Sequence, residues 1–224
     1  MKALIFDSGA LINLSMNGLI YILEGLKKNF DGKFLITQEV KGETIDRPMG
    51  IQRFELGALQ IKNLIDTKIL EMPSSLGIDE NLLKNETMRL VNNANRTMQV
   101  KGQWVHLVEE AEMSCVALSA ELNRRGFDTL IAIDERTTRM LCENPYNLEK
   151  IMSGKLHQNV KLVSSDANIF GKCNFIRSSE LVYTAYKKGL IKLTGKRVLE
   201  ALLYATKYKG ASISLEEIDT LKKT

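Results

Sequence analysis

The sequence predicts an α/β protein, a three-layer α/β/α sandwich with a central parallel sheet and additional helical insertions. Short runs rich in Ile, Leu and Phe alternate along the chain with segments of helical periodicity. Such runs are typical of buried strands, and their alternation with helices favours a parallel sheet covered on both faces. With 44% hydrophobic and 26% charged residues among 224, the chain can bury a sizeable core.

The first hundred residues predict strands and helices in alternation. The expected elements are a strand at 3–6, a helix at 19–28, a strand at 34–37, a helix at 51–66, a further strand at 68–72 and a helix at 80–99. Pro73 ends the third strand, and Asp79 is a plausible cap for the last helix. Because that helix is polar and rich in Asn, we expect it to project from the core.

The second half continues the same rhythm. A helix is expected over 108–126, because Val108, Ala111, Cys115, Leu118 and Leu122 repeat at spacings of three and four. After it we expect a strand at 129–133, a helix over 135–142 limited by Pro145, strands at 160–163 and 173–176, and helices at 179–188 and 195–208.

Composition favours a cytoplasmic protein that does not enter a membrane. No window reaches eighteen apolar residues, and the chain passes from Met1 and Lys2 straight into a strand-like run. Cys115, Cys142 and Cys173 are odd in number and widely spaced, which argues against a disulfide framework and a zinc knuckle. We expect them to act as small buried apolar residues.

The basic residues are concentrated near the C-terminus. Seven lie between 187 and 209 (Lys187, Lys188, Lys192, Lys196, Arg197, Lys207 and Lys209), against Glu200 alone. With tyrosines nearby, this stretch is suited to a nucleic-acid backbone, although a solvated helix face is the plainer interpretation.

Carboxylates follow two of the expected strands. Asp7 comes directly after 3–6 and Asp134 after 130–133, while Glu43 and Glu112 lie between them in the chain. The carboxyl ends of parallel strands meet at one edge, where four carboxylates repel one another unless a cation neutralises them. Oxygen ligands alone indicate Mg²⁺ or Mn²⁺.

Four motifs resemble those of PIN-domain proteins, a family of Mg²⁺/Mn²⁺-dependent ribonucleases. They are Leu-Ile-Phe-Asp-Ser-Gly-Ala-Leu-Ile at 4–12, Thr-Gln-Glu-Val-Lys-Gly-Glu at 37–43, Glu-Met-Ser-Cys-Val-Ala-Leu-Ser-Ala-Glu at 112–121 and Asp-Glu-Arg-Thr-Thr-Arg at 134–139. The last two are similar to one archaeal and bacterial branch with an E-x-S-x-x-A-L-x helix and a D-[DE]-R-x-x-R motif. Residues 176–179 and 187–191 resemble the family's closing strand and helix.

The resemblance implies a PIN-like fold and a ribonuclease that hydrolyses RNA with a metal-activated water. The implied catalytic residues are Asp7, Glu43, Glu112 and Asp134, with Glu135 as a further metal ligand. Glu39 is an alternative to Glu43, and Asp166 competes with Asp134, since it also follows a strand.

Several cations are candidate RNA ligands. Arg136 and Arg139 are suited to clamping a phosphate, although ordinary helix-surface cations are the plainer interpretation. The basic stretch adds Lys187, Lys188, Lys196 and Arg197.

Two insertions distinguish this chain from compact members of the family. We expect a nuclease domain at 1–192, with insertions at about 49–103 and 143–173, and a basic helical extension at 193–224. The expected partners are RNA and, through the insertions, a protein; a homodimer is also left open. Trp104, the only tryptophan, is expected to anchor the start of the acidic helix, with base stacking as the alternative.

Two rival interpretations start from the same residues. The first motif also resembles that of haloacid-dehalogenase-like phosphatases, but that family needs a second Asp where this chain has Gly9. The stronger rival is a PIN domain without catalytic activity that serves as an RNA-binding scaffold in RNA processing or ribosome assembly.

Overall fold

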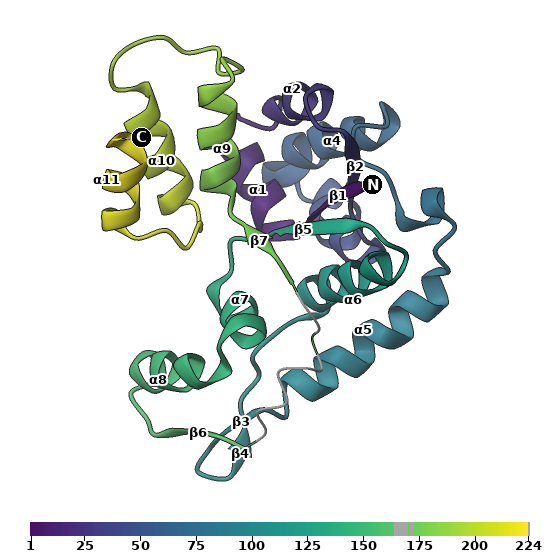
Figure 1. Ribbon diagram of the computed structural model, residues 1–224, viewed down its shortest axis with the longest axis vertical. Coiled ribbons are helices and arrows are strands. Elements are labelled where there is room, and N and C mark those ends of the chain that lie inside the picture. Colours follow the sequence, from purple (N-terminus) through teal and green to yellow (C-terminus); the bar gives the residue numbers. More distant parts are fainter. Residues whose placement is uncertain (164–169, 171–172, 224) are drawn as a thin grey trace.

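A four-stranded parallel sheet lies at the centre of the molecule (Figure 1). The structure is a computed structural model and describes residues 1–163, 170 and 173–223. The strands are β1 (Lys2–Phe6), β2 (Gly32–Leu35), β5 (Asp128–Ala132) and β7 (Phe175–Ile176), in the order β2-β1-β5-β7. Because all four run the same way, the residues that follow them gather at one edge.

Helices cover both faces of this sheet, so the predicted three-layer α/β/α sandwich is confirmed (Figure 1). On one face α6 (Glu110–Arg124) packs on β1 and β5, with α3 (Gln38–Lys41) against it. On the other face the helix α9 (Ser178–Lys187) contacts both α1 (Ser8–Met16) and α2 (Ile22–Lys28). The helix α4 (Gln52–Asp66) packs against α1.

The polar helix α5 (Glu80–Ala94) lies along α6, so the expectation that it projects from the core is wrong. Its buried residues Leu83, Thr87, Leu90 and Ala94 form a stripe at helical spacing. This stripe is narrow and includes a threonine, so the polar residues around it dominate the composition. The helix also ends earlier than expected, because the chain turns into β3 (Met98–Val100).

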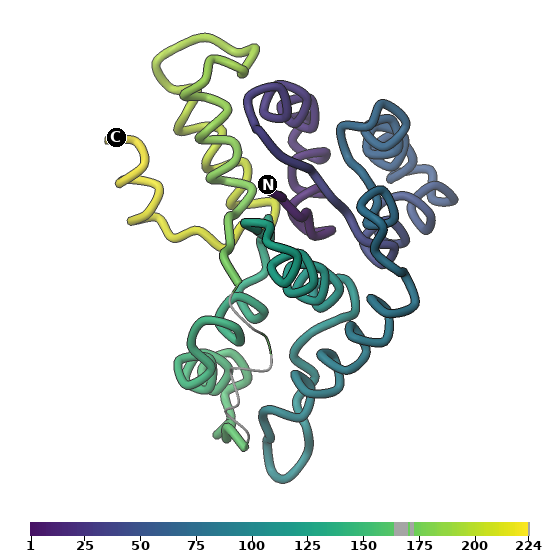
Figure 2. The backbone as a smooth tube through the Cα atoms, turned by 45° about the vertical axis from the view of Figure 1, so that its right-hand side comes forward, coloured from purple at the N-terminus to yellow at the C-terminus, as the bar shows by residue number. Residues whose placement is uncertain are grey.

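The end of the first predicted insertion and the second insertion meet in one lobe, at the opposite end of the molecule from the C-terminal helices (Figures 1 and 2). There β3 pairs antiparallel with β4 (Gln103–Trp104) and with β6 (Val160–Leu162). The helix α7 (Arg136–Glu143) contacts α8 (Pro145–Leu156), which packs on β6. Pro145 therefore starts a helix as its first residue, where its missing N–H costs nothing.

Other details of the prediction are also corrected. The expected strand at 68–72 is reduced to a single bridge between Leu35 and Glu71. Cys142 and Cys173, distant in the sequence, lie close enough for their thiols to share a hydrogen bond, and both are only half-buried. Short helical turns at Gly42–Asp46 (π), Pro48–Gly50 and Pro73–Leu76 complete the connections.

The C-terminal helices have a small core of their own. The helices α10 (Val198–Tyr208) and α11 (Leu215–Lys223) enclose Leu203, Ala211, Ile213 and Ile218, and Tyr183 of α9 packs against this cluster. The extension is therefore attached to the sandwich in part through α9. Among the described residues, no helix is both long enough and apolar enough to span a bilayer.

Candidate functional site

Asp7 lies at the carboxyl edge of the sheet, where β1 passes into α1. Its Oδ2 accepts a hydrogen bond from Gly9 N at 3.1 Å and caps the helix, and its side chain is almost completely buried. Its Oδ1 is also buried and accepts no hydrogen bond in the described structure. A buried carboxylate oxygen without a donor is costly, so this atom is open to a proton or a cation.

The environment of Asp7 opposes its negative charge. Burial raises its pKa to about 8, and the negative charges of Glu112 and Glu43 act in the same direction. The amides of Gly9 and Ser8 oppose this shift only in part. Asp7 therefore keeps its proton at neutral pH unless a positive charge enters the cluster.

Glu112 and Glu135 belong to the same electrostatic cluster. Glu112, in the first turn of α6, accepts a hydrogen bond from Glu109 N at 3.0 Å through Oε2. Its pKa is raised mainly by burial, and also by the charges of Glu135 and Glu43. Glu135 caps α7 by accepting from Thr138 N at 2.7 Å, also through Oε2. One oxygen of each glutamate is thus fixed by a helix N-terminus.

Glu43 lies in the π-helical turn that follows α3, and two contacts position this segment. Thr37 caps α3 through its hydroxyl, which also shares a 2.6 Å hydrogen bond with Ser114 of α6. Glu43 and Glu39 both line a polar cavity of about 540 Å³. The charge of Glu43 contributes to the raised pKa of both Asp7 and Glu112, which favours Glu43 as the member of the cluster.

Asp134 is held by protein donors. Its Oδ1 accepts from Ser178 N at 2.8 Å, and its Oδ2 accepts from Ser178 Oγ at 2.6 Å and from Asn13 Nδ2 at 2.9 Å. The side chain is buried beside Gly9, where an added Cβ would lie 3.2 Å from Asp7 Oδ2 and 4.0 Å from Asp134 Cβ. Glycine therefore lets the Asp7 and Asp134 strand ends approach closely.

Asn13 extends this network to the C-terminal extension. The same Nδ2 group that meets Asp134 also donates to the carbonyl of Thr206 in α10 at 2.9 Å. The backbone of Asp134 in turn accepts from Ser212 N at 3.2 Å. The residues around Asp134 thus join α1, α9 and the C-terminal extension at the edge of the sheet.

The acids surround one region but do not form a finished ligand cage. Among the described residues, no three His, Cys, Asp or Glu side chains are grouped closely enough to hold a metal ion. The chemistry of the donors nevertheless suits Mg²⁺ or Mn²⁺, because they are carboxylates and one buried oxygen is unpaired. Asp166 lies outside the described residues.

The two candidate arginines differ in their surroundings. Arg136 is exposed at the start of α7. Arg139 is half-buried and donates to Ser212 Oγ at 2.8 Å, and burial beside Arg177 lowers its pKa. Arg139 therefore contacts the C-terminal extension, and Arg136 is the better placed of the two to meet a phosphate.

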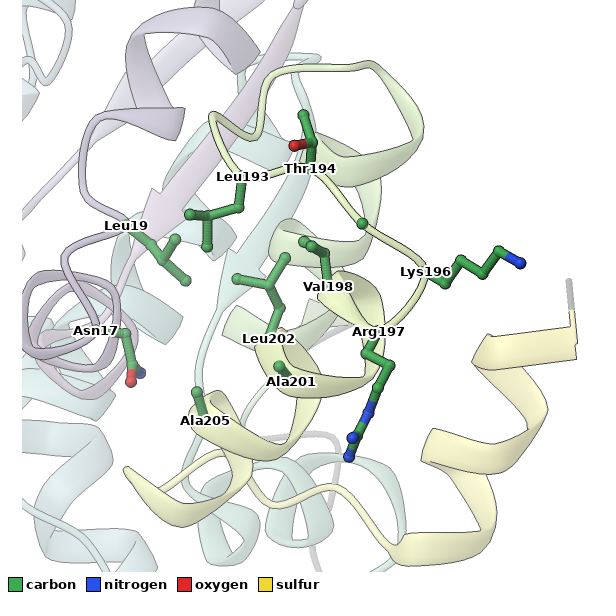
Figure 3. Close-up of a pocket in the computed structure, with 11 residues that line it drawn as sticks. Asn17, Leu19, Leu193, Thr194, Lys196, Arg197, Val198, Ala201, Leu202 and Ala205 are labelled. Carbon is green, nitrogen blue, oxygen red and sulfur yellow. The ribbon is translucent and has the colours of Figure 1, made fainter.

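The predicted basic surface is exposed. Lys187 and Lys188 end α9, while Lys196 and Arg197 precede α10. Beside Lys196 and Arg197 is an apolar groove of about 680 Å³, which is lined by Leu19, Leu193, Val198 and Leu202 (Figure 3). Figure 3 shows Lys196 and Arg197 pointing away from these apolar side chains. Lys207 is occupied by a hydrogen bond to the Ile213 carbonyl.

Trp104 does not anchor the acidic helix, so that prediction is wrong. It lies on the edge strand β4 with 49% of its surface exposed. The positions next to α6 are instead filled by Leu107 and Val108, which are buried and held through the Asn95 side chain.

Sequence reasoning also missed Asn13 and Ser178, the two donors to Asp134. The motif at 4–12 stops one residue before Asn13, and Ser178 falls in the closing segment that resembles the PIN family. A search for buried polar residues just beyond the motif acids would have marked both.

Comparison with known proteins gives no matching family model, no matching curated protein and no matching solved structure.

Proposed function

We propose that this protein is a metal-dependent ribonuclease of the PIN type. The observation that carries the proposal is the buried, unpaired Oδ1 of Asp7, in a carboxyl group whose pKa is raised to about 8. A fold keeps such an unpaired buried carboxyl most readily where a ligand compensates for it, and carboxyl groups with strongly perturbed pKa values cluster at functional sites. The PIN-like motifs supply the reaction class.

In this proposal Asp7, Glu43, Glu112 and Glu135 hold Mg²⁺ or Mn²⁺ through the oxygens that no helix cap occupies. A bound cation would lower the pKa of a water molecule and neutralise charge on the scissile phosphate. Asp134 fixes the end of β5 through Ser178 and Asn13, which keeps the carboxyl edge rigid. Rigid support of this kind is what a precise catalytic geometry requires.

The exposed basic residues would guide the RNA toward the acids. Lys187, Lys188, Lys196 and Arg197 offer positive charge on and just after α9, and Arg136 adds one beside the acidic cluster. Contacts with phosphates are independent of sequence and position the strand for cleavage. The cytoplasmic location expected from the sequence stays a prediction.

A second candidate function is an RNA-binding scaffold without catalysis. It is favoured by the absence, among the described residues, of three acids grouped tightly enough for a metal. The three hydrogen bonds that Asp134 accepts also favour the scaffold, because they leave its carboxylate few free lone pairs for a metal ion.

Cleavage of a labelled structured RNA separates the two functions. Wild type and Asp7→Asn are each assayed with Mn²⁺ and with a chelator. The proposal predicts cleavage by wild type with Mn²⁺ alone, no cleavage by Asp7→Asn, and products with a 5′-phosphate and a 3′-hydroxyl.

Two results would contradict the proposal of a ribonuclease that uses a metal-activated water. A 2′,3′-cyclic product would exclude attack by water. RNA that is bound by both proteins and cut by neither would favour the scaffold.

A further inference from the structure

The exposed Trp104 lies in a small pocket on the lobe that the two insertions form. The pocket has a volume of about 320 Å³ and is lined by the apolar residues Val100, Val105 and Leu156 and by the polar residues Lys101, Gln103 and Gln158, in addition to Trp104. That volume is at the lower end for small-molecule sites, so it suits one flat ring rather than a folded partner. The residues around the pocket thus include one indole ring and two amide side chains.

The hairpin that carries Trp104 closes in a two-residue turn. Val100 pairs with Gln103, and the two residues between them, Lys101 and Gly102, have φ of 50° and 81°. Two successive positive φ angles are typical of the tight turns that join twisted strands, and glycine adopts them without strain. The turn places an exposed lysine three residues from the tryptophan.

The lobe is strongly basic. The segments 96–104 and 145–163 contain Arg96, Lys101, Lys150, Lys155 and Lys161, with Glu149 as their one acid. All five cations are exposed, and none makes an ion pair with a residue that the structure describes. The charge of Glu149 is turned inward, because its Oε2 accepts from Leu162 N at 2.8 Å. The lobe therefore complements a polyanion.

A short, fixed segment connects the pocket with the acids. Trp104 lies eight residues before Glu112, a span of at most about 28 Å even when extended. Asn95 Oδ1 accepts from Leu107 N at 2.6 Å and from Val108 N at 3.1 Å, which holds this segment against the end of α5. A ligand bound at Trp104 is therefore kept within reach of the acidic cluster.

We propose that the Trp104 pocket binds an unpaired nucleobase, and that the lobe thereby holds single-stranded RNA beside the acidic cluster. The base stacks on the indole ring, which is sequence-tolerant because every base has a π-face. The lysines of the lobe meet the flanking phosphates. The assignment of RNA rests on the proposed function, whereas the pocket itself requires no catalysis.

Because Trp104 is the only tryptophan, its fluorescence reports on this pocket alone. The intact protein is titrated, in chelator to prevent cleavage, with an oligoadenylate of about twelve nucleotides, within the usual site size. An abasic ribose-phosphate oligomer of equal length and adenosine monophosphate are titrated in parallel. We expect strong quenching by the oligoadenylate, weaker quenching by the mononucleotide and none by the abasic oligomer.

Variants test the energetic contribution of the ring. Anisotropy of a labelled oligoadenylate should show affinity lower by about 5- to 150-fold for Trp104→Ala, and a smaller loss for Trp104→Phe. Tyr146→Ala is the matched control, since Tyr146 is an aromatic residue of the same lobe, 68% exposed and outside the pocket. Its affinity should equal that of wild type. Circular dichroism verifies that each variant is folded.

Three outcomes would overturn the proposal. The first is equal RNA affinity for wild type and Trp104→Ala. The second is quenching by the mononucleotide without quenching by the oligomer. The third is a wild-type dimer that Trp104→Ala converts to a monomer with unchanged RNA affinity, which would make the pocket a protein interface. These three outcomes can be told apart from a failure of the proposed ribonuclease activity. RNA binding at Trp104 is measured in chelator, where no cleavage occurs, whereas the activity is tested separately by comparing cleavage by wild type and by Asp7→Asn.

Discussion

Replacing Asp7 by Asn should stabilise the metal-free protein as the pH rises. The pKa of Asp7 is raised from 3.8 to about 8 in the folded state, so folding favours its protonated form. Between these values the unfolded chain releases the proton and the folded chain keeps it, so stability falls with increasing pH. Asn keeps an oxygen that can cap α1 and carries no charge.

The size of the effect follows from the shift. One pKa unit corresponds to about 1.4 kcal/mol. The free energy of unfolding of wild type should therefore fall by about 4 kcal/mol relative to that of Asp7→Asn at pH 7, and by less than about 2 kcal/mol at pH 5. For a protein of this length each kcal/mol moves Tm by about 2–4 °C, which gives a difference of about 8–16 °C at pH 7.

Thermal unfolding of both proteins in chelator, from pH 5 to pH 8, measures the difference. Asp31→Asn, at an exposed position, is the control and should follow wild type at every pH. Saturating Mn²⁺ should raise the Tm of wild type and leave that of Asp7→Asn nearly unchanged, because only the ionised carboxylate gains a partner. A difference in Tm between wild type and Asp7→Asn that stays constant across this pH range would refute the reasoning.

Two further predictions concern the support of the site and its approach surface. Asn13→Ala removes the donor shared by Asp134 and an α10 carbonyl, so urea unfolding should show a loss of about 1–3 kcal/mol, against less than about 0.5 kcal/mol for the exposed Asn92→Ala. An equal loss of stability in Asn13→Ala and Asn92→Ala would contradict the role of Asn13 as a bridge between Asp134 and α10. Lys196→Gln with Arg197→Gln should lower the slope of log affinity for single-stranded RNA against log salt by about 1.4, equally for all sequences. An unchanged slope would place the RNA elsewhere.

The position of the acids at one edge of the sheet was predictable, because it depends on local patterns. The apolar runs before Asp7 and Asp134 become β1 and β5, which pair directly in parallel. When successive parallel strands are joined by helical crossovers, few sheet topologies are possible, and in a parallel sheet the carboxyl ends of the strands share one edge. The spacing of apolar residues likewise located α6 and Glu112 near its start.

The partners of Asp134 could not be predicted in the same way. Asn13 is 121 residues away and Ser178 is 44 residues away, so these hydrogen bonds exist only once the layers are packed. The helix α1 was itself missed. Its buried residues include Ala10, Leu11 and Leu14 beside the polar Asn13, which blurs the apolar stripe that identifies a surface helix.

Of the lobe's strands the sequence predicted only β6, expected at 160–163, and it missed β3 and β4 for a related reason. The two missed strands have only three and two residues, which is too few for a period of two to be recognised. The pairing of β3 with β6 also joins segments some sixty residues apart along the chain. Only this pairing reveals that the two insertions form one basic surface around Trp104.

Direct binding of Mn²⁺ tests the central claim most simply. Titration calorimetry would compare wild type with Glu112→Gln and with Glu55→Gln, an exposed glutamate of α4 that serves as the control. The account predicts binding to wild type and Glu55→Gln, with at least a tenfold loss, about 1.4 kcal/mol, in Glu112→Gln. Equal Mn²⁺ affinity in all three proteins, or no binding to wild type, would contradict a metal site at these carboxylates.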